Sequence, residues 1–273
     1  MKGLLCLAAI AVMGSAMAQE SKGKYAQVNG LKMYYEIHGT GKPLVLLHGA
    51  FGTAEGWGPF LELSKSRQLI VIEQQGHGRT ADINRPLDYR QMADDTAALL
   101  KQIGVQDADV FGYSMGGATA FALASKYPEL VRKLVVIGAG TGTIKDTYNP
   151  DVYAQFKMVD PETFNFPEVK DPYTKVAPDP SKWKSLVAKV VAMDGTMKAM
   201  PEKEVRGIKA HTLIIMGDRD AVKAEHAVEI YRWIPNSQLA IFPGADHFLP
   251  FANSGQVIFA LRAFLDSPMP GGK

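Results

Sequence analysis

Cysteine is almost absent from this chain: there is one among 273 residues, Cys6. It lies in an N-terminal segment that we expect to be cleaved off, so the mature protein would contain no cysteine. Such a protein forms no disulfide, offers no thiol nucleophile and does not depend on the redox state of its compartment. Cysteine chemistry is therefore excluded, while export into an oxidising compartment is compatible with the sequence.

Net charge is also small, since 30 Lys and Arg stand against 28 Asp and Glu, and no run of like charges occurs. This balance gives no electrostatic footprint for nucleic acid or an anionic membrane. The six histidines are too scattered for a metal site, and Gly76-His77-Gly78 lacks the rest of a dinucleotide-binding fingerprint. We therefore expect no metal, no cofactor and no nucleic acid partner, and a small molecule as substrate. Oligomeric state cannot be inferred from the sequence.

Long hydrophobic runs are missing apart from Leu4 to Met13, which follows the basic Lys2 and precedes Ala16-Met17-Ala18. A basic start, a short apolar stretch and a small-x-small site are typical of a secretory signal peptide. We predict a signal peptide over residues 1–18 and a mature chain from Gln19 that is periplasmic or secreted, without stable membrane anchoring. The run is too short to span a membrane, and an uncleaved anchor is the alternative. Cys6 lies within the run and not at the cleavage site, so lipid attachment is not expected.

The pattern of the mature chain favours one large α/β domain. Asn29-Gly30 between two alternating segments, 25–28 and 31–37, predicts a β-hairpin at the start. Short apolar runs bounded by Gly, Pro and Asp then predict buried parallel strands at 44–47, 69–72, 110–111, 134–137, 213–216 and 239–242. Segments of helical period lie between them at 89–103, 116–126, 221–233 and 257–265. This alternation predicts a doubly wound, mostly parallel sheet with an N-terminal hairpin.

One interval breaks the alternation. Residues 146–207 carry no buried-strand pattern and hold seven of the sixteen prolines. Amphipathic helices are expected at 151–159, 181–193 and 202–208. Because a structureless loop of this length is improbable in a compact domain, we predict a small helical cap inserted into a core of residues 19–145 and 208–273. Such a cap shapes the substrate pocket if it lies over the strand ends; packing at the side of the domain is the alternative.

Gly112-Tyr113-Ser114-Met115-Gly116 is the most informative motif. It reads G-x-S-x-G, follows an apolar strand and precedes an alanine-rich helix. In this setting the serine is held in a sharp turn with its Oγ above the sheet, beside the free N–H groups of the helix start. The motif predicts Ser114 as a nucleophile; an ordinary glycine-rich turn whose serine only caps the helix is the alternative.

A nucleophilic serine needs a base, and the base needs a group that orients it. His247 follows the last predicted strand, at the edge of the sheet where α/β active sites assemble. We predict His247 as the base in preference to the other five histidines. The orienting carboxylate should lie beyond another strand, and both Asp218 and Asp220 fit; Asp246, adjacent to His247, ranks behind them.

Taken together, these motifs resemble the α/β-hydrolase superfamily, and within it the bacterial esterases, perhydrolases and C–C hydrolases that carry a small helical cap. The resemblance spans the mature chain and rests on 48–50, 76–80, 112–116, 217–220 and 245–247. The order Ser, Asp, His is that of the superfamily. A serine nucleophile argues against its haloalkane dehalogenase and epoxide hydrolase branches, which use aspartate at that position.

The resemblance implies a role for particular residues. It implies Asp220 as the acid, and the backbone N–H groups of Ala50 and Met115 as the oxyanion hole. His48 would then steady the oxyanion loop. Two positions depart from the family pattern: Glu73-Gln74-Gln75, where an acidic residue, any residue and arginine are usual, and Asp246, where glycine is commoner. The second places a carboxylate beside the base, where it could replace Asp220 as its partner.

The expected function is therefore that of a serine hydrolase that cleaves carboxylic esters of small molecules through an acyl-enzyme. A lactonase, a C–C bond hydrolase and a cofactor-free perhydrolase are the enzymatic alternatives, and a non-catalytic binding member of the fold is the alternative of another class. The pocket is expected to be apolar and lined by Phe51, Trp57, Tyr113 and Phe248, together with methionines of the cap.

Overall fold

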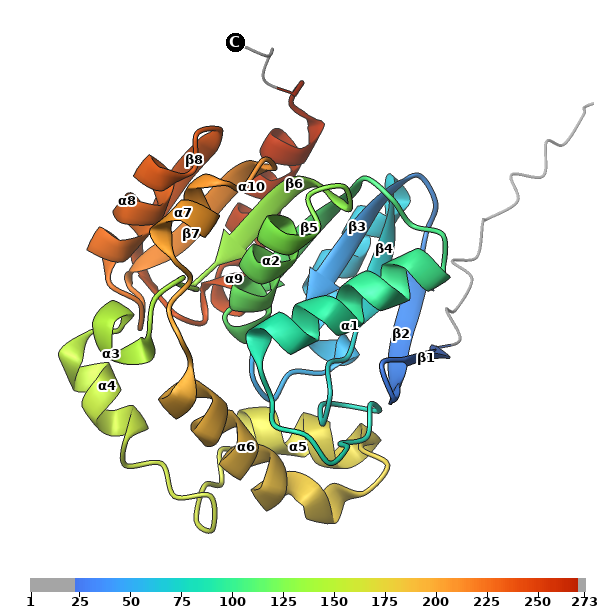
Figure 1. Ribbon diagram of the computed structural model, residues 1–273, viewed down its shortest axis with the longest axis vertical. Coiled ribbons are helices and arrows are strands. Elements are labelled where there is room, and N and C mark those ends of the chain that lie inside the picture. The colour runs from blue at the N-terminus through green and yellow to red at the C-terminus, as the bar shows by residue number, and fades with distance from the viewer. Residues whose placement is uncertain (1–22, 270–273) are drawn as a thin grey trace, which may run out of the picture.

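The computed structural model describes residues 23–269, in which a single eight-stranded sheet forms the centre (Figure 1). Its strands are β1 (Lys24–Val28), β2 (Leu31–His38), β3 (Lys42–Leu47), β4 (Arg67–Ile72), β5 (Ala108–Tyr113), β6 (Val131–Ile137), β7 (His211–Arg219) and β8 (Ser237–Asp246). The spatial order is β1-β2-β4-β3-β5-β6-β7-β8. Strands β3 to β8 pair in parallel, whereas β1 and β2 pair antiparallel. The predicted fold class is confirmed.

The N-terminal hairpin is formed where the Asn-Gly pair predicts it. Asn29 and Gly30 have φ of 48° and 80°, the left-handed values that a two-residue hairpin turn of this kind requires. Val28 and Leu31 then pair directly across the turn. The hairpin places two antiparallel strands at one edge of the sheet, where β2 also pairs antiparallel with β4, the first of the parallel strands.

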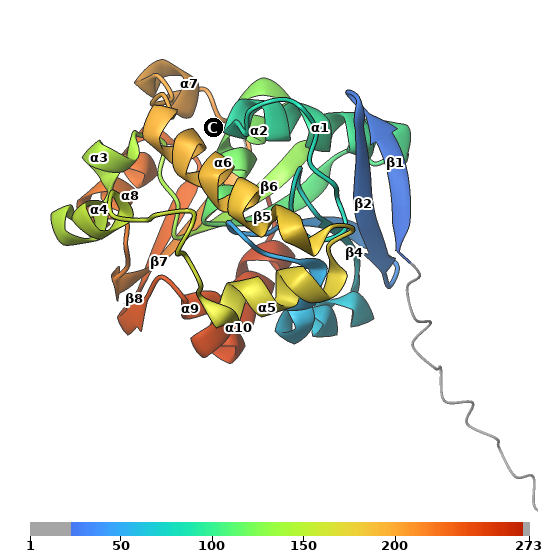
Figure 2. The ribbon, with the colours of Figure 1, turned by 90° about the horizontal axis from the view of Figure 1, so that it is seen from below.

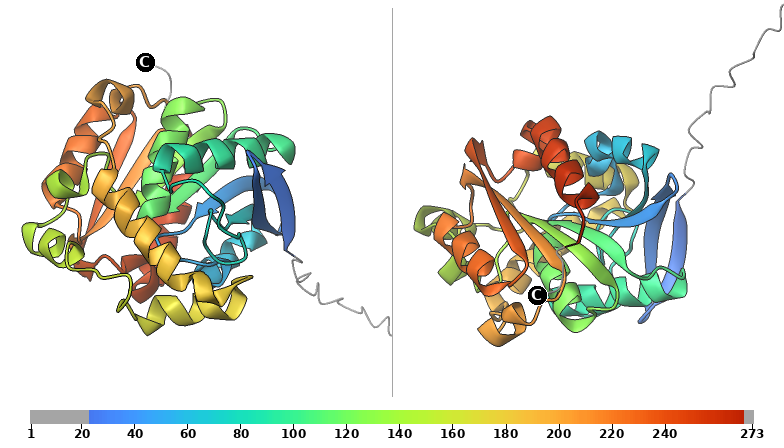
Figure 3. Two further views of the ribbon diagram at one scale, coloured as in Figure 1. Left: turned by 60° about the horizontal axis from the view of Figure 1, so that its bottom comes forward. Right: turned by 90° about the horizontal axis from the view of Figure 1, so that it is seen from above.

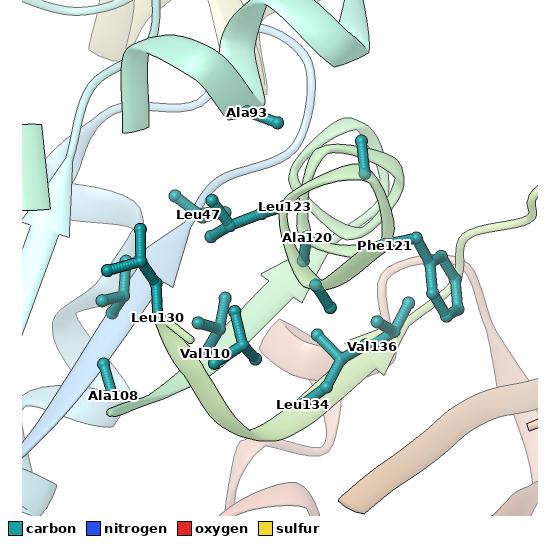
Figure 4. Packing of buried hydrophobic residues seen from close by; sticks show 14 of the residues in the cluster. Leu47, Ala93, Ala108, Val110, Ala120, Phe121, Leu123, Leu130, Leu134 and Val136 are labelled. Carbon is teal, nitrogen blue, oxygen red and sulfur yellow. The ribbon is translucent and has the colours of Figure 1, made fainter. Parts of the chain in front are cut away.

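The parallel strands are continuously apolar because both of their faces are covered. Along β3, Val45 and Leu47 point into one core cluster while Leu44 and Leu46 point into another. Figure 4 shows the first cluster, in which side chains of β3, β5 and β6 pack against those of α1 (Tyr89–Gln102) and α2 (Met115–Lys126). This two-sided burial is what the short apolar runs of the sequence indicate.

Helices form a layer on each face of the sheet. The first face carries α1, α2, α7 (Glu202–Arg206) and α8 (Ala224–Trp233), and the second carries the 3-10 helical segment η1 (Ala54–Lys65) and α10 (Ser254–Asp266). Figure 3 shows the two layers in the view from above. Outside the interval between β6 and β7, two elements of the described residues were not predicted from the sequence: η1, and the short α9 (Leu249–Ala252) that follows β8.

Between β6 and β7 the chain forms α3 (Ile144–Thr147), α4 (Pro150–Phe156), α5 (Pro167–Val176), the 3-10 turn η2 (Pro180–Lys182), α6 (Trp183–Thr196) and α7. Figure 2 shows α5 and α6 lying next to each other. Their apolar side chains form a third core cluster that includes Trp183 and Leu186. Met115 also belongs to this cluster; it comes from the sharp turn at residues 112–116, which we call the elbow. Helix α5 was not predicted because its sequence contains Pro172, which reads as a helix breaker. The boundaries 146–207 of the cap stay a prediction.

The predicted signal peptide, the cleavage site and Cys6 lie outside the described residues. Of the helices in residues 23–269, none has the length and apolar character needed to cross a membrane.

Candidate active site

Ser114 stands between β5 and α2 in a backbone conformation that serine rarely adopts, with φ 52° and ψ −119°. The flanking glycines make this turn possible. A Cβ on Gly116 would lie 2.0 Å from the carbonyl oxygen of Leu47, and a Cβ on Gly112 would lie 2.3 Å from that of Gly116. Because no side chain fits at either position, the glycines of the motif are required by close backbone packing.

The structure brings Ser114, His247 and Asp220 into contact in series. The Nε2 atom of His247 lies 3.0 Å from Oγ of Ser114, and its Nδ1 lies 2.8 Å from Oδ1 of Asp220. A carboxylate can only accept here, so Nδ1 carries the proton and Nε2 is free to accept from the serine hydroxyl. This arrangement is the one that activates a serine for attack on a carbonyl.

Only one of the three aspartates considered from the sequence contacts the imidazole. Asp220 is buried, and its Oδ1 also accepts from the N–H of Val222 at 3.1 Å. Asp218 is exposed at the end of β7. Asp246 accepts from the N–H of Phe248 at 2.8 Å and thereby caps the turn after β8. The departure from the family pattern at Asp246 therefore leaves the His247 to Asp220 contact in place.

Ala50 and Met115 line the same small cavity as Ser114. Met115 is the first residue of α2, so its N–H has no partner within the helix. Within residues 23–269 neither N–H donates a hydrogen bond to the protein. Two free donors beside the serine are what the stabilisation of a developing oxyanion requires.

The loop that carries Ala50 is held by His48. The Nδ1 atom of His48 donates to the carbonyl of Gly49 at 2.7 Å, and its Nε2 accepts from the N–H of Gln74 at 3.1 Å. Phe51, the next residue after Ala50, has φ 63°. His77 packs against the His48 ring at 5.0 Å between centroids. Burial lowers the pKa of His48 to about 4 and that of His77 to about 3, so both are neutral in the native state.

These two histidines make stability sensitive to acid. Their native pKa values lie below the ordinary value, so the unfolded chain binds more protons and stability is lost as pH falls below about 6.5. From about pH 7.5 to about pH 5, each should cost on the order of 2 kcal/mol. Urea unfolding at the two pH values, compared with His48→Gln and His77→Gln, measures this. An equal pH dependence in wild type and both variants would contradict it.

A cavity of about 560 Å³ lies beside the elbow. It is mainly apolar, and Phe51, Trp57, Tyr113 and Phe248, the four residues predicted for the pocket, all line it. The Tyr113 ring also packs against the His247 imidazole, with ring centroids 5.3 Å apart. Because Ala50 and Tyr113 both line this cavity, a sizeable apolar group of a substrate can lie in it close to Ser114.

Sequence reasoning missed several lining residues. In the large cavity these are Phe166, Val169, Pro172 and Phe251, and in the small one Tyr89, Tyr148 and Asp194. They come from α1, from residues between β6 and β7 and from α9, whose positions over the site no local pattern indicates. Of the methionines expected in the lining, Met197 lines the small cavity, whereas Met158 is 82% exposed. The expectation was wrong for Met158 because it lies in the turn after α4, directed to solvent.

No group of three His, Cys, Asp or Glu side chains in residues 23–269 is arranged to hold a metal ion.

Known proteins share both the sequence pattern and the fold. The family model of the alpha/beta hydrolase fold matches residues 42–210. A stretch of 114 residues is 39% identical to RutD of Azorhizobium caulinodans and covers 41% of this chain and 43% of RutD. The 2-hydroxymuconate semialdehyde hydrolase of Pseudomonas sp. strain CF600 is 26% identical over 86% of this chain and 91% of its own length. Among solved structures, the meta-cleavage product hydrolase of Pseudomonas fluorescens IP01 superposes with a TM-score of 0.73 at 20% identity, covering 89% of this chain and 97% of that one.

Proposed function

The chain belongs to the α/β-hydrolase fold family, and from this we propose that it is a serine hydrolase that cleaves carboxylic ester bonds of small molecules through an acyl-enzyme. The observation that carries the proposal is the series of contacts from Ser114 through His247 to Asp220, at 3.0 and 2.8 Å. Two unpartnered N–H groups and an apolar cavity beside the serine support it.

The proposed reaction has two halves. In the first, Oγ of Ser114 attacks the ester carbonyl while Nε2 of His247 takes the hydroxyl proton and passes it to the departing alcohol. In the second, His247 takes a proton from water, the resulting hydroxide attacks the acyl-enzyme, and the proton returns to Ser114 as the acid leaves. Asp220 holds the ring in the tautomer that each step needs and stabilises the imidazolium.

The tetrahedral intermediates carry their negative charge on the former carbonyl oxygen. The N–H groups of Ala50 and Met115 are the donors proposed for it. Loss of one such donor typically costs about 2.7–4 kcal/mol of transition-state stabilisation, so this pair contributes a large part of the expected rate enhancement.

The charge of the cavity walls favours neutral substrates. The large cavity is lined by Glu55 and Glu168 and the small one by Asp194, and neither is lined by Lys or Arg. A substrate that carries a carboxylate would therefore be bound without a cationic partner, which is unfavourable in an apolar site. This is why we place the ester hydrolase ahead of a C–C bond hydrolase that acts on an anionic substrate.

A lactonase or a perhydrolase would use the same three residues. Rates of hydrolysis of a lactone, and rates of turnover of an ester in the presence of hydrogen peroxide, would distinguish these activities from simple ester hydrolysis.

Export through the N-terminal segment is proposed from the sequence alone. Sequencing the N-terminus of the protein recovered from the periplasm or the medium tests it.

Covalent labelling tests the enzyme against a non-catalytic binding member of the fold. A fluorophosphonate should form one adduct with the folded protein, on the peptide that contains Ser114. His247→Ala should slow labelling by at least about a hundredfold, because the hydroxyl loses its base. Mass spectrometry of the digested adduct measures both results. A folded protein that takes up no label and turns over no p-nitrophenyl ester would favour the binding function.

A further inference from the structure

The small cavity beside Ser114, about 40 Å³ in volume, has a polar wall that the mechanism above does not use. Tyr89 at the start of α1, Tyr148 directly after α3 and Asp194 in the last turn of α6 supply it. Ala50 and Met115 line the same cavity. A group bound against the polar wall would therefore lie next to the carbonyl that Ser114 attacks.

Asp194 is an incompletely satisfied carboxylate. Asp194 is half-buried. The Tyr89 hydroxyl donates to its Oδ1, whereas within residues 23–269 its Oδ2 accepts no hydrogen bond and neither oxygen forms an ion pair. Burial raises the pKa of Asp194 to about 6, which still leaves it ionised at about pH 7.5. A carboxylate in such surroundings gains from any hydrogen-bond donor that enters the cavity.

Tyr148 complements this carboxylate. Its hydroxyl forms no hydrogen bond in the described part of the chain, and burial, together with the nearby carboxylates of Asp194 and Asp220, raises its pKa. The wall thus offers one acceptor, Oδ2 of Asp194, and one donor, the Tyr148 hydroxyl. A substrate hydroxyl is the smallest group that donates to the first and accepts from the second. An ammonium group only donates, so it would leave the hydroxyl proton of Tyr148 without an acceptor.

We propose that Asp194 and Tyr148 form a specificity subsite that binds a hydroxyl on the substrate within a few bonds of the scissile carbonyl. The small volume, enough for only a few atoms, restricts this side of the substrate to a short hydroxylated group, while the 560 Å³ cavity takes the apolar side. The inference rests on the proposed ester hydrolysis and names its substrate class: esters that join a short hydroxylated part to an apolar part.

Two pairs of esters test the subsite, each pair exchanging a hydroxyl for a methyl group of similar size. Benzyl 2-hydroxypropanoate against benzyl 2-methylpropanoate places the hydroxyl on the acyl side. 2-Hydroxyethyl phenylacetate against propyl phenylacetate places it on the alcohol side. Wild type should prefer the hydroxylated ester of one pair about tenfold or more in kcat/KM. The reason is that the methyl analogue of that pair cannot form the charge-assisted hydrogen bond to the carboxylate of Asp194. The pair that shows the preference identifies the side of the substrate that occupies the small cavity.

Asp194→Ala and Tyr148→Phe should each lower that ratio severalfold or more, and Asp171→Asn, an exposed charge change on α5, should leave it unchanged. A role limited to holding α6 in place would alter both esters of a pair equally and leave the ratio intact. The proposal is overturned if wild type shows no preference in either pair, or if the ratio survives both substitutions. Should Asp194→Ala not fold, Tyr148→Phe alone decides.

Failure of the subsite is separable from failure of the hydrolase. Calorimetric binding of the same esters to Ser114→Ala gives the hydroxyl preference without turnover. A binding preference without hydrolysis in wild type would support the subsite and refute the proposed function, whereas hydrolysis without preference would do the reverse.

Discussion

Replacing Ser114 by alanine is expected to abolish nearly all ester hydrolysis. The substitution removes the hydroxyl that lies 3.0 Å from Nε2 of His247, so kcat for p-nitrophenyl esters should fall at least a hundredfold and by as much as about 10⁶-fold. The residual rate would come from the oxyanion donors and the binding of the substrate. A panel of esters with increasing acyl length, measured with wild type and variant, gives both the loss and the acyl preference.

The control is Ser185→Ala, which changes an exposed serine on α6 and should leave the rates as they are. Thermal unfolding should show that Ser114→Ala remains folded. If turnover persists within a hundredfold of wild type, Ser114 is not the nucleophile and the proposed mechanism is wrong.

Asp220→Asn is the second substitution with a large expected effect. An amide at this position can donate a hydrogen bond to Nδ1 and thereby favour the tautomer in which Nε2 carries the proton, so the ring no longer accepts from Ser114. We expect kcat to fall by about 10³- to 10⁴-fold, with a much smaller change in KM. Steady-state kinetics near neutral pH measures the change.

Matched controls lie close to Asp220 and to His247 in the sequence. Asp218→Asn and Asp246→Asn make the same chemical change in carboxylates that do not contact His247, and each should reduce kcat by less than about fivefold. A loss for Asp246→Asn as large as that for Asp220→Asn would mean that Asp246 is the partner of the base during the reaction.

The sheet and the elbow could be predicted because their signals are local. A strand that is covered on both faces must be apolar throughout, as Leu44 to Leu47 show. The turn at Ser114 admits only glycine at positions 112 and 116, because a Cβ there would overlap with neighbouring backbone atoms. The choice among three aspartates could not be made from residue type. It depends on the bend at the end of β7, which leaves Asp218 exposed and turns Asp220 into the protein.

The walls of the two cavities were the least predictable part. Tyr89, Tyr148 and Asp194 lie 46 or more residues apart along the chain and on different segments, and only the path between β6 and β7 brings them together. Hydrophobic periodicity reports which face of a helix is buried and carries no information about where that helix sits over the sheet. The burial of Asp95, which pairs with Arg85 and accepts from Asn29, illustrates the same limit, because an aspartate in a helix is usually exposed to solvent.

The backbone angles of Phe51 and Ser114 have a consequence for attempts to make the protein more robust. Four non-glycine residues in 23–269 have positive φ; two, Asn29 and Asp107, are of the types that tolerate it. The other two adjoin the predicted oxyanion donors, and conformations of this kind cost of order 1–3 kcal/mol each. Selection for heat resistance alone would therefore favour substitutions that remove the backbone strain at Phe51 and Ser114. Because both residues adjoin the predicted oxyanion donors, the more heat-stable variants obtained in this way would be expected to lose turnover.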